Sequence, residues 1–235
     1  MFIIAKKKTL IIIALIVVAS VLTLVIGVTV PATRFTDDAK TVVLDAGHGG
    51  IDNGARGRVT KTGEAEINLD IVLRLQKMLE KEGIRVVLTR KDANGLYDKV
   101  DGFKLRDMQA RKKIIEDTKP DLVVSVHCNV FPVSARRGAQ VFYYGMSVDG
   151  KRLANSLQTT LNELNRTTCG KTYSALSADY YMLNCSVYPS ALAECGFLSN
   201  PEDEALLCTE KYRETVAYAL FSGINGYLHS PLTAP

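Results

Sequence analysis

Three short apolar runs each lead to a side chain that can bind a metal or move a proton. The runs are Thr41–Asp45, Asp121–Val126 and Ser190–Ala193. They are followed by His48, His127 and Glu194. Uninterrupted apolar runs of this length are typical of strands in a buried parallel sheet, and ligands bind at the carboxyl ends of such strands. We therefore expect the three side chains to meet at one edge of one sheet, as in a metal-dependent hydrolase.

The remaining pattern alternates between helix and strand. Helical periodicity predicts helices at Glu66–Glu82, Phe103–Lys119, Lys151–Asn165 and Lys211–Leu228, with a short helical turn at Glu202–Leu207. Further strands are expected at Arg85–Thr89, Gln140–Tyr144 and Tyr180–Leu183. The alternation predicts a single α/β domain over residues 41–230, with a mostly parallel sheet flanked by helices. Residues 231–235 form a tail.

The N-terminal segment differs from this domain. An uncharged run of 21 residues, Leu10–Val30, follows three lysines at positions 6–8. As a helix it would span a hydrocarbon core of ~30 Å, and the lysines would stay in the cytoplasm. We expect a cytoplasmic stub (1–8), a transmembrane signal anchor (9–30) and a tether (31–40), which places the domain outside the membrane. The alternatives are a cleaved signal, which would give a secreted domain, and a buried core helix.

Charge and cysteine content narrow the function classes. The net charge is +4, and the three lysines near the N-terminus leave +1 for the rest, so a nucleic-acid partner has no support. None of the five cysteines forms a C-x-x-C pair, which argues against a structural zinc ribbon. We expect the cysteines to be small buried side chains. Cys128 and Cys195 should point to the opposite face of their strands from His127 and Glu194.

The two histidines need a third ligand if they bind zinc. A catalytic zinc has about three protein ligands and an open position for water. Glu64 and Glu66 stand at or just before the start of the first predicted helix, which lies beside the carboxyl end of the preceding strand. Alternatively, either glutamate is an acidic residue without a metal, placed at a helix N-terminus where the helix dipole favours a negative charge. The spacing leaves both possibilities open.

Glu194 is the candidate general base. It would take a proton from the attacking water and return it to the leaving nitrogen. The alternative is a carboxylate paired with a buried arginine, because a glutamate at the end of an apolar strand needs a partner. His229 ends the closing helix, where the helix dipole favours a cation, and has no expected function. Tyr180 and Tyr181 are expected in the core or in a cleft wall.

Five motifs follow one another in order between Thr41 and Leu228. They are Asp45-Ala-Gly-His-Gly-Gly-Ile-Asp-Asn-Gly-Ala55, Glu64-Ala-Glu-Ile-Asn-Leu69, Thr89-Arg90, Ser125-Val-His-Cys-Asn129 and Glu194-Cys-Gly-Phe-Leu-Ser-Asn200. In these motifs the chain resembles the zinc-dependent N-acetylmuramoyl-L-alanine amidases of the type-3 group. One departure is that the usual R-x-x-x-A-N reads Arg111-Lys-Lys-Ile-Ile-Glu116, so no substrate contact is carried over from that helix.

The resemblance implies a site and a fold. One zinc ion would be bound by His48, Glu64 and His127, with Glu194 as the catalytic glutamate. Arg90 and Asn129 would be substrate-binding residues, and the sheet would have six strands. The implied reaction is hydrolysis of the amide between the lactyl group of N-acetylmuramic acid and L-alanine in peptidoglycan.

The architecture resembles a subgroup of that family. A membrane anchor followed directly by the catalytic domain, without wall-binding repeats, is similar to the sporulation-associated members. Those act on the spore cortex and prepare muramic-δ-lactam, which germination enzymes recognise. No long insertion is present that could plug the cleft, so we expect an open cleft controlled by expression, an accessory protein or metal supply.

Two other functions are compatible with parts of the pattern. A zinc carboxypeptidase acting within the stem peptide would need an arginine for the terminal carboxylate, and Arg90 or Arg56 could supply it. An anchored peptidoglycan-binding module without catalysis would not need Glu194 beside three intact ligands. The amidase hypothesis therefore explains more of the sequence than either alternative.

Overall fold

The computed structural model describes Ile12, residues 38–97 and residues 101–230. Within those residues, no helix has both the length and the apolar character required to cross a membrane. The predicted stub and tail, almost all of the predicted anchor and most of the tether lie outside the described residues. These assignments stay predictions.

The fold is built on one sheet of six strands in the order β2-β1-β3-β6-β4-β5. The strands are β1 (Thr41–Ala46), β2 (Arg85–Leu88), β3 (Leu122–Asn129), β4 (Gln140–Tyr143), β5 (Leu176–Ser177) and β6 (Ser190–Phe197). β2, β1, β3 and β6 are parallel to one another, whereas β4 is antiparallel to β6. The prediction of a mostly parallel sheet is confirmed. The three strands that lead to His48, His127 and Glu194 are direct neighbours.

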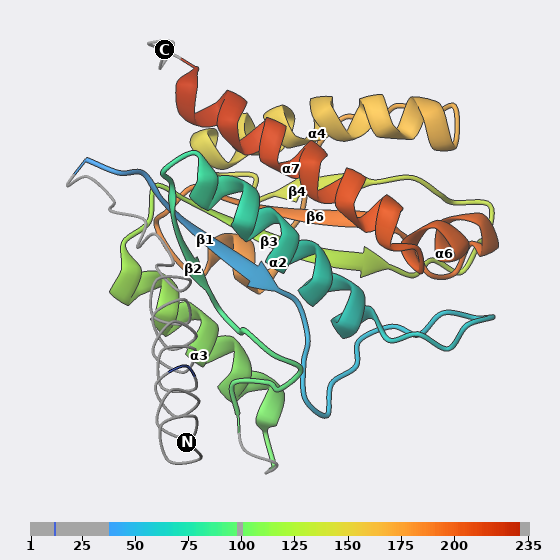
Figure 1. Cartoon of the computed structure of the whole chain (residues 1–235), viewed down its shortest axis with the longest axis horizontal. Helices are drawn as coiled ribbons and strands as arrows, with labels where there is room; N and C mark the ends of the chain where they lie inside the picture. Colours follow the sequence, from blue (N-terminus) through green and yellow to red (C-terminus); the bar gives the residue numbers. More distant parts are fainter. Residues whose placement is uncertain (1–11, 13–37, 98–100, 231–235) are drawn as a thin grey trace, which may run out of the picture. The chain divides into compact units, whose positions relative to one another are not determined.

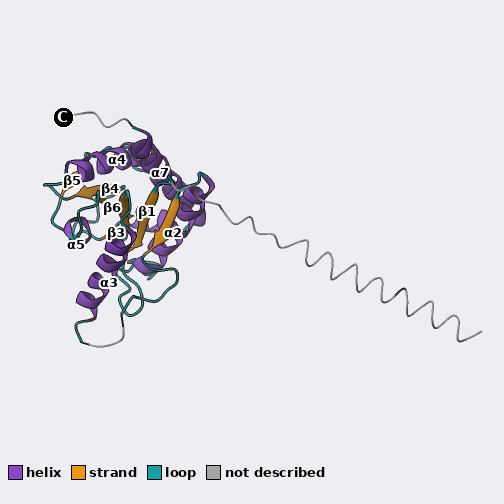
Figure 2. Ribbon diagram, turned by 90° about the vertical axis from the view of Figure 1, so that its left-hand side faces the viewer, coloured by secondary structure: helices purple, strands orange, loops and turns teal. Residues whose placement is uncertain are grey.

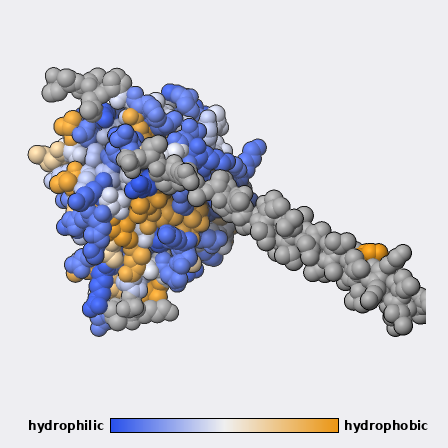
Figure 3. Space-filling view, turned by 60° about the vertical axis from the view of Figure 1, so that its left-hand side comes forward, coloured by the Kyte–Doolittle hydropathy of each residue, from blue (hydrophilic) through white to orange (hydrophobic). Residues whose placement is uncertain are grey.

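Helices cover both faces of the sheet (Figures 1 and 2). The helices α2 (Glu64–Lys81), α4 (Val148–Thr168) and α7 (Glu210–His229) pack on one face, and α3 (Phe103–Thr118) and α5 (Tyr181–Asn184) lie on the other. The short α6 (Pro201–Leu207) packs against β6 and α7. Because successive strand residues point to opposite faces, Val42 joins the large core under α2, and Val43 joins a smaller cluster with Ile115 and Met182. On the side that Figure 3 presents, hydrophilic side chains surround an apolar area.

Helix α2 positions one of the site residues at its first turn. Its buried side chains Ile67, Ile71 and Leu75 recur every four residues and pack into the large core. Gly83, with φ of 76°, follows the helix in the left-handed conformation that glycine adopts without strain. The packed stripe fixes the rotation of α2, and with it the direction in which Glu64 points.

The predicted strand at Tyr180–Leu183 is wrong. The sheet receives Leu176–Ser177 instead, and Tyr181–Asn184 form the one-turn helix α5. The amide of Cys185 donates to the carbonyl of Tyr181 at 2.9 Å, as in a helix. A four-residue apolar run is too short for periodicity to separate a strand from a helical turn. The other predicted elements are present, with ends shifted by a few residues.

Candidate active site

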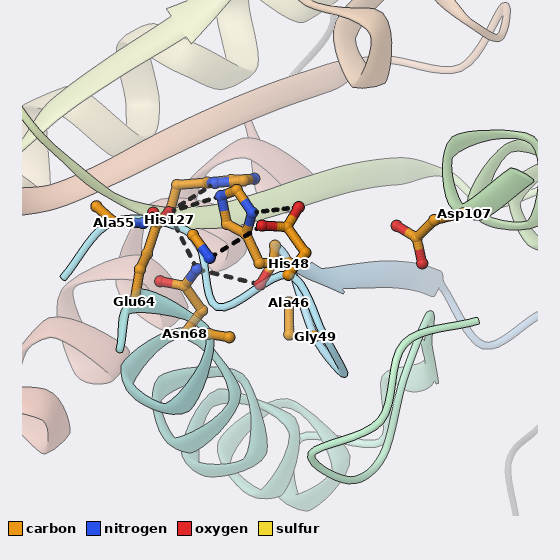
Figure 4. A network of polar contacts seen from close by, with 12 residues as sticks. Ala46, His48, Gly49, Ala55, Glu64, Asn68, Asp107 and His127 are labelled. Atoms are coloured by element: carbon orange, nitrogen blue, oxygen red, sulfur yellow. Dashed lines mark hydrogen bonds and ion pairs between the residues drawn. The ribbon is translucent and has the colours of Figure 1, made fainter. Parts of the chain in front are cut away.

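Three side chains from different segments meet at the carboxyl edge of the sheet (Figure 4). His48 lies in the loop after β1, His127 lies near the end of β3, and Glu64 begins α2. Glu64 Oε1 lies 3.2 Å from His48 Nε2 and 3.0 Å from His127 Nδ1. One potential ligand atom from each residue lies within 4.8 Å of the other two. The group is therefore compact enough to hold a single metal ion.

Glycine makes this close approach possible. A Cβ at position 47 would lie 2.1 Å from His127 Cε1, which no side chain permits. A Cβ at Gly54 would lie 2.5 Å from Glu64 Oε2, and this glycine also has a φ of 64°. His48 itself has a φ of 63°, a conformation that non-glycine residues rarely adopt. The loop from Gly47 to Gly54 is thus shaped to present the His48 ring.

Glu64 is a buried carboxylate held by several donors. Its Oε2 accepts from the amide of Ala55 at 2.8 Å, and its Oε1 accepts from the amide of Cys128 at 3.1 Å and from Asn68 Nδ2 at 3.3 Å. Burial alone would raise the pKa of Glu64, but hydrogen bonds with His127 and His48 hold it well below its usual range. Glu64 is therefore ionised, which is the form that binds metal.

A second carboxylate orients His48. Asp52 Oδ2 lies 3.1 Å from His48 Nδ1, on the opposite side of the ring from Glu64. Burial would lower the pKa of His48, but the hydrogen bonds and charges of Glu64 and Asp52 outweigh it and raise the pKa to about 9. A carboxylate on the outer nitrogen of a histidine fixes the direction in which the other nitrogen points. Asp52 therefore holds Nε2 toward the centre of the site.

Glu194 faces the same site from the neighbouring strand. It pairs in register with His127 where β6 runs parallel to β3. Its Oε2 is buried and has no hydrogen-bond partner among the described residues. Burial raises the pKa of Glu194 to about 7. A buried carboxylate with a free oxygen and a near-neutral pKa has the properties of a general base.

The donor set fits a divalent metal. Two imidazole nitrogens and one carboxylate are ligands that zinc accepts in catalytic sites, and three protein ligands leave a position open. The side chain of Glu194 lines the same cavity as His48 and His127, and its Oε2 has no hydrogen-bond partner among the described residues. The cavity measures about 370 Å³. Its walls beyond the site include the following residues: Tyr97, Phe103, Lys104, Asp107, Met108, Arg111, Tyr180, Tyr181, Met182 and Leu192.

Comparison with known proteins places this site in a family. The family profile described as N-acetylmuramoyl-L-alanine amidase matches residues 42–226, most of the chain. The chain belongs to the N-acetylmuramoyl-L-alanine amidase family. This family membership confirms the resemblance drawn from the motifs.

Individual relatives agree with the family assignment. The amidase is 34% identical over 192 residues to the germination-specific N-acetylmuramoyl-L-alanine amidase of Bacillus subtilis, covering 80% of this chain and 79% of the relative. It is 38% identical to the CwlD amidase of Clostridioides difficile, solved in complex with the GerS lipoprotein, with a TM-score of 0.75 over 80% of this chain and 98% of that one. The catalytic domain of CwlV from Bacillus (Paenibacillus) polymyxa is 30% identical, with a TM-score of 0.70 over 80% and 98%.

The geometry separates the two glutamates that the spacing left open. Glu64 lies between the two histidines, whereas Glu66 is exposed on α2 and is absent from the metal-binding group. Cys128 and Cys195 are buried in the core, as expected, whereas Cys169, Cys185 and Cys208 are only half-buried, so the prediction of buried cysteines holds for two of the five. Tyr180 and Tyr181 form part of the cavity wall.

Arg90 is held within the fold and does not line the described cavity, so its contact with substrate stays a prediction. Its side chain is buried, and its guanidinium donates to the backbone carbonyls of Ala46, Gly47, Ala65 and Asp92. In the amidase, Arg90 therefore ties the loop after β1 to the start of α2. Asn129 ends β3 and does not line the described cavity, so its contact with substrate stays a prediction.

The buried network behind His48 was not predicted from the sequence. Arg111 is fully buried and donates to Asp45, to Asp107 and to the carbonyl of His48, the last at 2.7 Å. Asp45 itself indicates such a network, because a charged carboxylate at the end of a buried strand requires a partner. No spacing rule connects Asp45 to an arginine 66 residues away.

Proposed function

We propose that this amidase uses one zinc ion to hydrolyse the amide between the lactyl group of N-acetylmuramic acid and L-alanine in peptidoglycan. The observation that supports this proposal most strongly is the buried, unpartnered oxygen of Glu194 beside His48, Glu64 and His127. A site that only binds would have no use for such a group, because leaving a buried carboxylate oxygen without a donor costs stability.

The division of labour follows from the positions of the side chains. His48, Glu64 and His127 would hold the zinc, which supplies Lewis-acid polarisation of the scissile carbonyl and a lowered pKa for water. Glu194 accepts the proton of the attacking water and passes it to the amide nitrogen as the bond breaks. Its pKa near neutrality suits both halves of this transfer. Asp52 keeps His48 in place throughout.

The test is digestion of purified peptidoglycan by the full chain, with and without added zinc, followed by mass spectrometry. We expect release of intact stem peptides that begin with L-alanine, only with zinc. Cuts inside the stem peptide would replace the proposal with a peptidase. Binding to peptidoglycan without any release, with or without an accessory protein, would replace it with a binding module.

The peptidase alternative loses one of its supports. It requires a cation free to bind the terminal carboxylate of a peptide, and Arg90 is committed to four backbone carbonyls. Arg56 is exposed but does not line the described cavity. The amidase proposal needs neither arginine.

We further propose a role in the spore cortex, where the reaction prepares muramic-δ-lactam for germination enzymes. The support is similarity to the germination-specific amidase of Bacillus subtilis and to CwlD. Because CwlD was solved with the GerS lipoprotein, an accessory lipoprotein is the partner to look for. Deleting the gene in its spore-forming host should remove muramic-δ-lactam from the cortex; a cortex of unchanged composition would contradict this role.

Localisation follows from the N-terminal sequence. We propose that residues 9–30 anchor the chain and place the catalytic domain on the extracytoplasmic side, where peptidoglycan lies. The support is the uncharged run preceded by three lysines. Fractionation of cells with and without residues 1–30 is the test. Equal release of both forms into the soluble fraction would contradict an anchor.

A further inference from the structure

One cation of the cavity has no ion-pair partner among the residues that the structure describes. Of the two basic side chains other than histidine in its lining, Arg111 is buried against Asp45 and Asp107. Lys104 is exposed and forms no ion pair with any carboxylate in the described parts of the chain. Asp52, a carboxylate of the same cavity, already contacts the His48 ring. Among the described residues, nothing neutralises the positive charge that Lys104 presents to whatever fills the cavity.

Helix stability does not explain this lysine. Lys104 is the second residue of α3, whose first turn contains no acidic residue. A cation in the first turn of a helix opposes the helix dipole, so the position is locally unfavourable. The N-cap residue Gly102 also provides no side-chain cap. The ammonium group of Lys104 therefore does not stabilise the helix, but its side chain lines the cavity.

Lys104 lines the same cavity as Asp52, His48 and Glu194. Burial would raise the pKa of Asp52, but hydrogen bonds from His48 and Gly54 lower it, and the charge of Lys104 adds to this lowering. Asp52 in turn contacts the His48 ring at 3.1 Å. An anion bound by Lys104 would thus lie in the cavity that His48, His127 and Glu194 also line.

We propose that Lys104 binds a carboxylate of the stem peptide and so selects the anionic form of the substrate. This inference rests on the proposed function. In the polymer, the residue after L-alanine is D-glutamate, whose γ-carboxyl group continues the chain and whose α-carboxyl group is either free or amidated. The free α-carboxylate is the anion nearest to the cleaved amide. The sugars of the glycan chain, being neutral, offer no comparable partner for an ammonium group.

Two probes of equal charge separate the possible carboxylates. N-Acetylmuramoyl-L-alanyl-D-glutamine keeps the α-carboxylate, and N-acetylmuramoyl-L-alanyl-D-isoglutamine keeps the γ-carboxylate instead. With the zinc-loaded full chain, we expect kcat/KM to favour the α-acid about fivefold, the size typical of a solvent-exposed ion pair. The Lys104→Gln variant should bring this ratio close to one through KM, and Lys104→Glu should reverse it.

Arg106→Gln is the matched control. Arg106 is an exposed cation on the same helix that does not line the cavity, and two residues of helix turn it about 200° away. Its substitution should leave the ratio unchanged. A wild-type ratio near one, a preference for the γ-acid, or a ratio that survives Lys104→Gln would each overturn the proposal.

A binding measurement separates this inference from the amidase proposal itself. If the wild-type chain cleaved neither probe, the proposed reaction would fail on these substrates. Calorimetry on the zinc-loaded Glu194→Gln variant, with and without Lys104→Gln, would still compare the affinities for the two probes. Tighter binding of the α-acid that depends on Lys104 supports the proposal, and equal affinities overturn it.

Discussion

Arg111 Nη1 donates to Asp45 Oδ1 at 2.5 Å, and neither side chain is more than 1% exposed. The same guanidinium donates to the carbonyl of His48, whose backbone has a φ of 63°. The pair therefore connects the end of β1, helix α3 and the loop that presents His48, a candidate metal ligand. The stability of the fold and the position of the His48 loop therefore both depend on the buried guanidinium of Arg111.

Replacing Arg111 with Met should destabilise the fold by about 3–5 kcal/mol, because it leaves the buried carboxylates of Asp45 and Asp107 without a counter-charge. Urea unfolding monitored by circular dichroism measures the change. Arg106→Met on the exposed side of the same helix should stay within about 0.5 kcal/mol of the wild type. Equal losses in both variants would show that the buried pair contributes nothing special.

The Asp45 pair should make stability depend on acid. Burial alone would raise the pKa of Asp45, but Arg111 and hydrogen bonds from Ser125 and Thr89 lower it to about 2. Because the folded pKa is below the unfolded value of about 3.9, the contribution is complete above about pH 4 and is lost as the pH falls through about 2. The difference in unfolding free energy between wild type and Asp45→Asn should shrink over that window. A difference independent of pH would contradict the assignment.

Glu64 and Glu66 should differ sharply in their effect on zinc. Glu64→Gln should weaken zinc binding more than about 100-fold, since the loss of an outer-shell partner alone costs 10- to 100-fold. Glu66→Gln removes an exposed charge from the same helical turn and should change zinc affinity little. Competition with a chromogenic chelator measures both constants. Similar losses in the two variants would remove Glu64 from the ligand set.

Glu194→Gln should separate binding from catalysis. The amide keeps the shape of the side chain but cannot accept the proton, so turnover should fall about 10²- to 10⁴-fold. Zinc should remain bound, because Glu194 is absent from the metal-binding group. Muropeptide release and zinc content, measured on the same preparation, give the answer. Unchanged turnover would exclude Glu194 as the base.

Zinc binding should release protons. Without metal the pKa of His48 is about 9, so at pH 7 its imidazole carries a proton that zinc must displace. Affinity should therefore increase as the pH rises toward about 9 and level off above it. Calorimetry in buffers of different ionisation enthalpy counts the protons released. A count of zero at pH 7 would mean that His48 is already neutral there.

The sequence was sufficient for the parts of the fold that rest on burial. Uninterrupted apolar runs predicted the buried strands β1, β3 and β6. Helical periodicity predicted α2 and α7, because each of these helices buries one face. Short elements show no such periodicity, which is why α5 was mistaken for a strand. The choice of Glu64 came from the family motif, since both glutamates suit the start of a helix. Contacts that join distant segments, such as Arg111 with Asp45, have no signature in local spacing.

The pairing of β6 with β3 has a consequence for assembly. Side chains at both faces of β6 are small or apolar along most of its length, so Glu194 is the residue that distinguishes the two faces most strongly. A slip of one residue would put Cys195 where Glu194 now faces His127, and would turn the base into the core. A slipped molecule would keep a sheet and all three metal ligands yet be inactive. Because an unpartnered carboxylate is costly in an apolar core, Glu194 itself opposes this slip, and the candidate base thereby sets the register of its own strand.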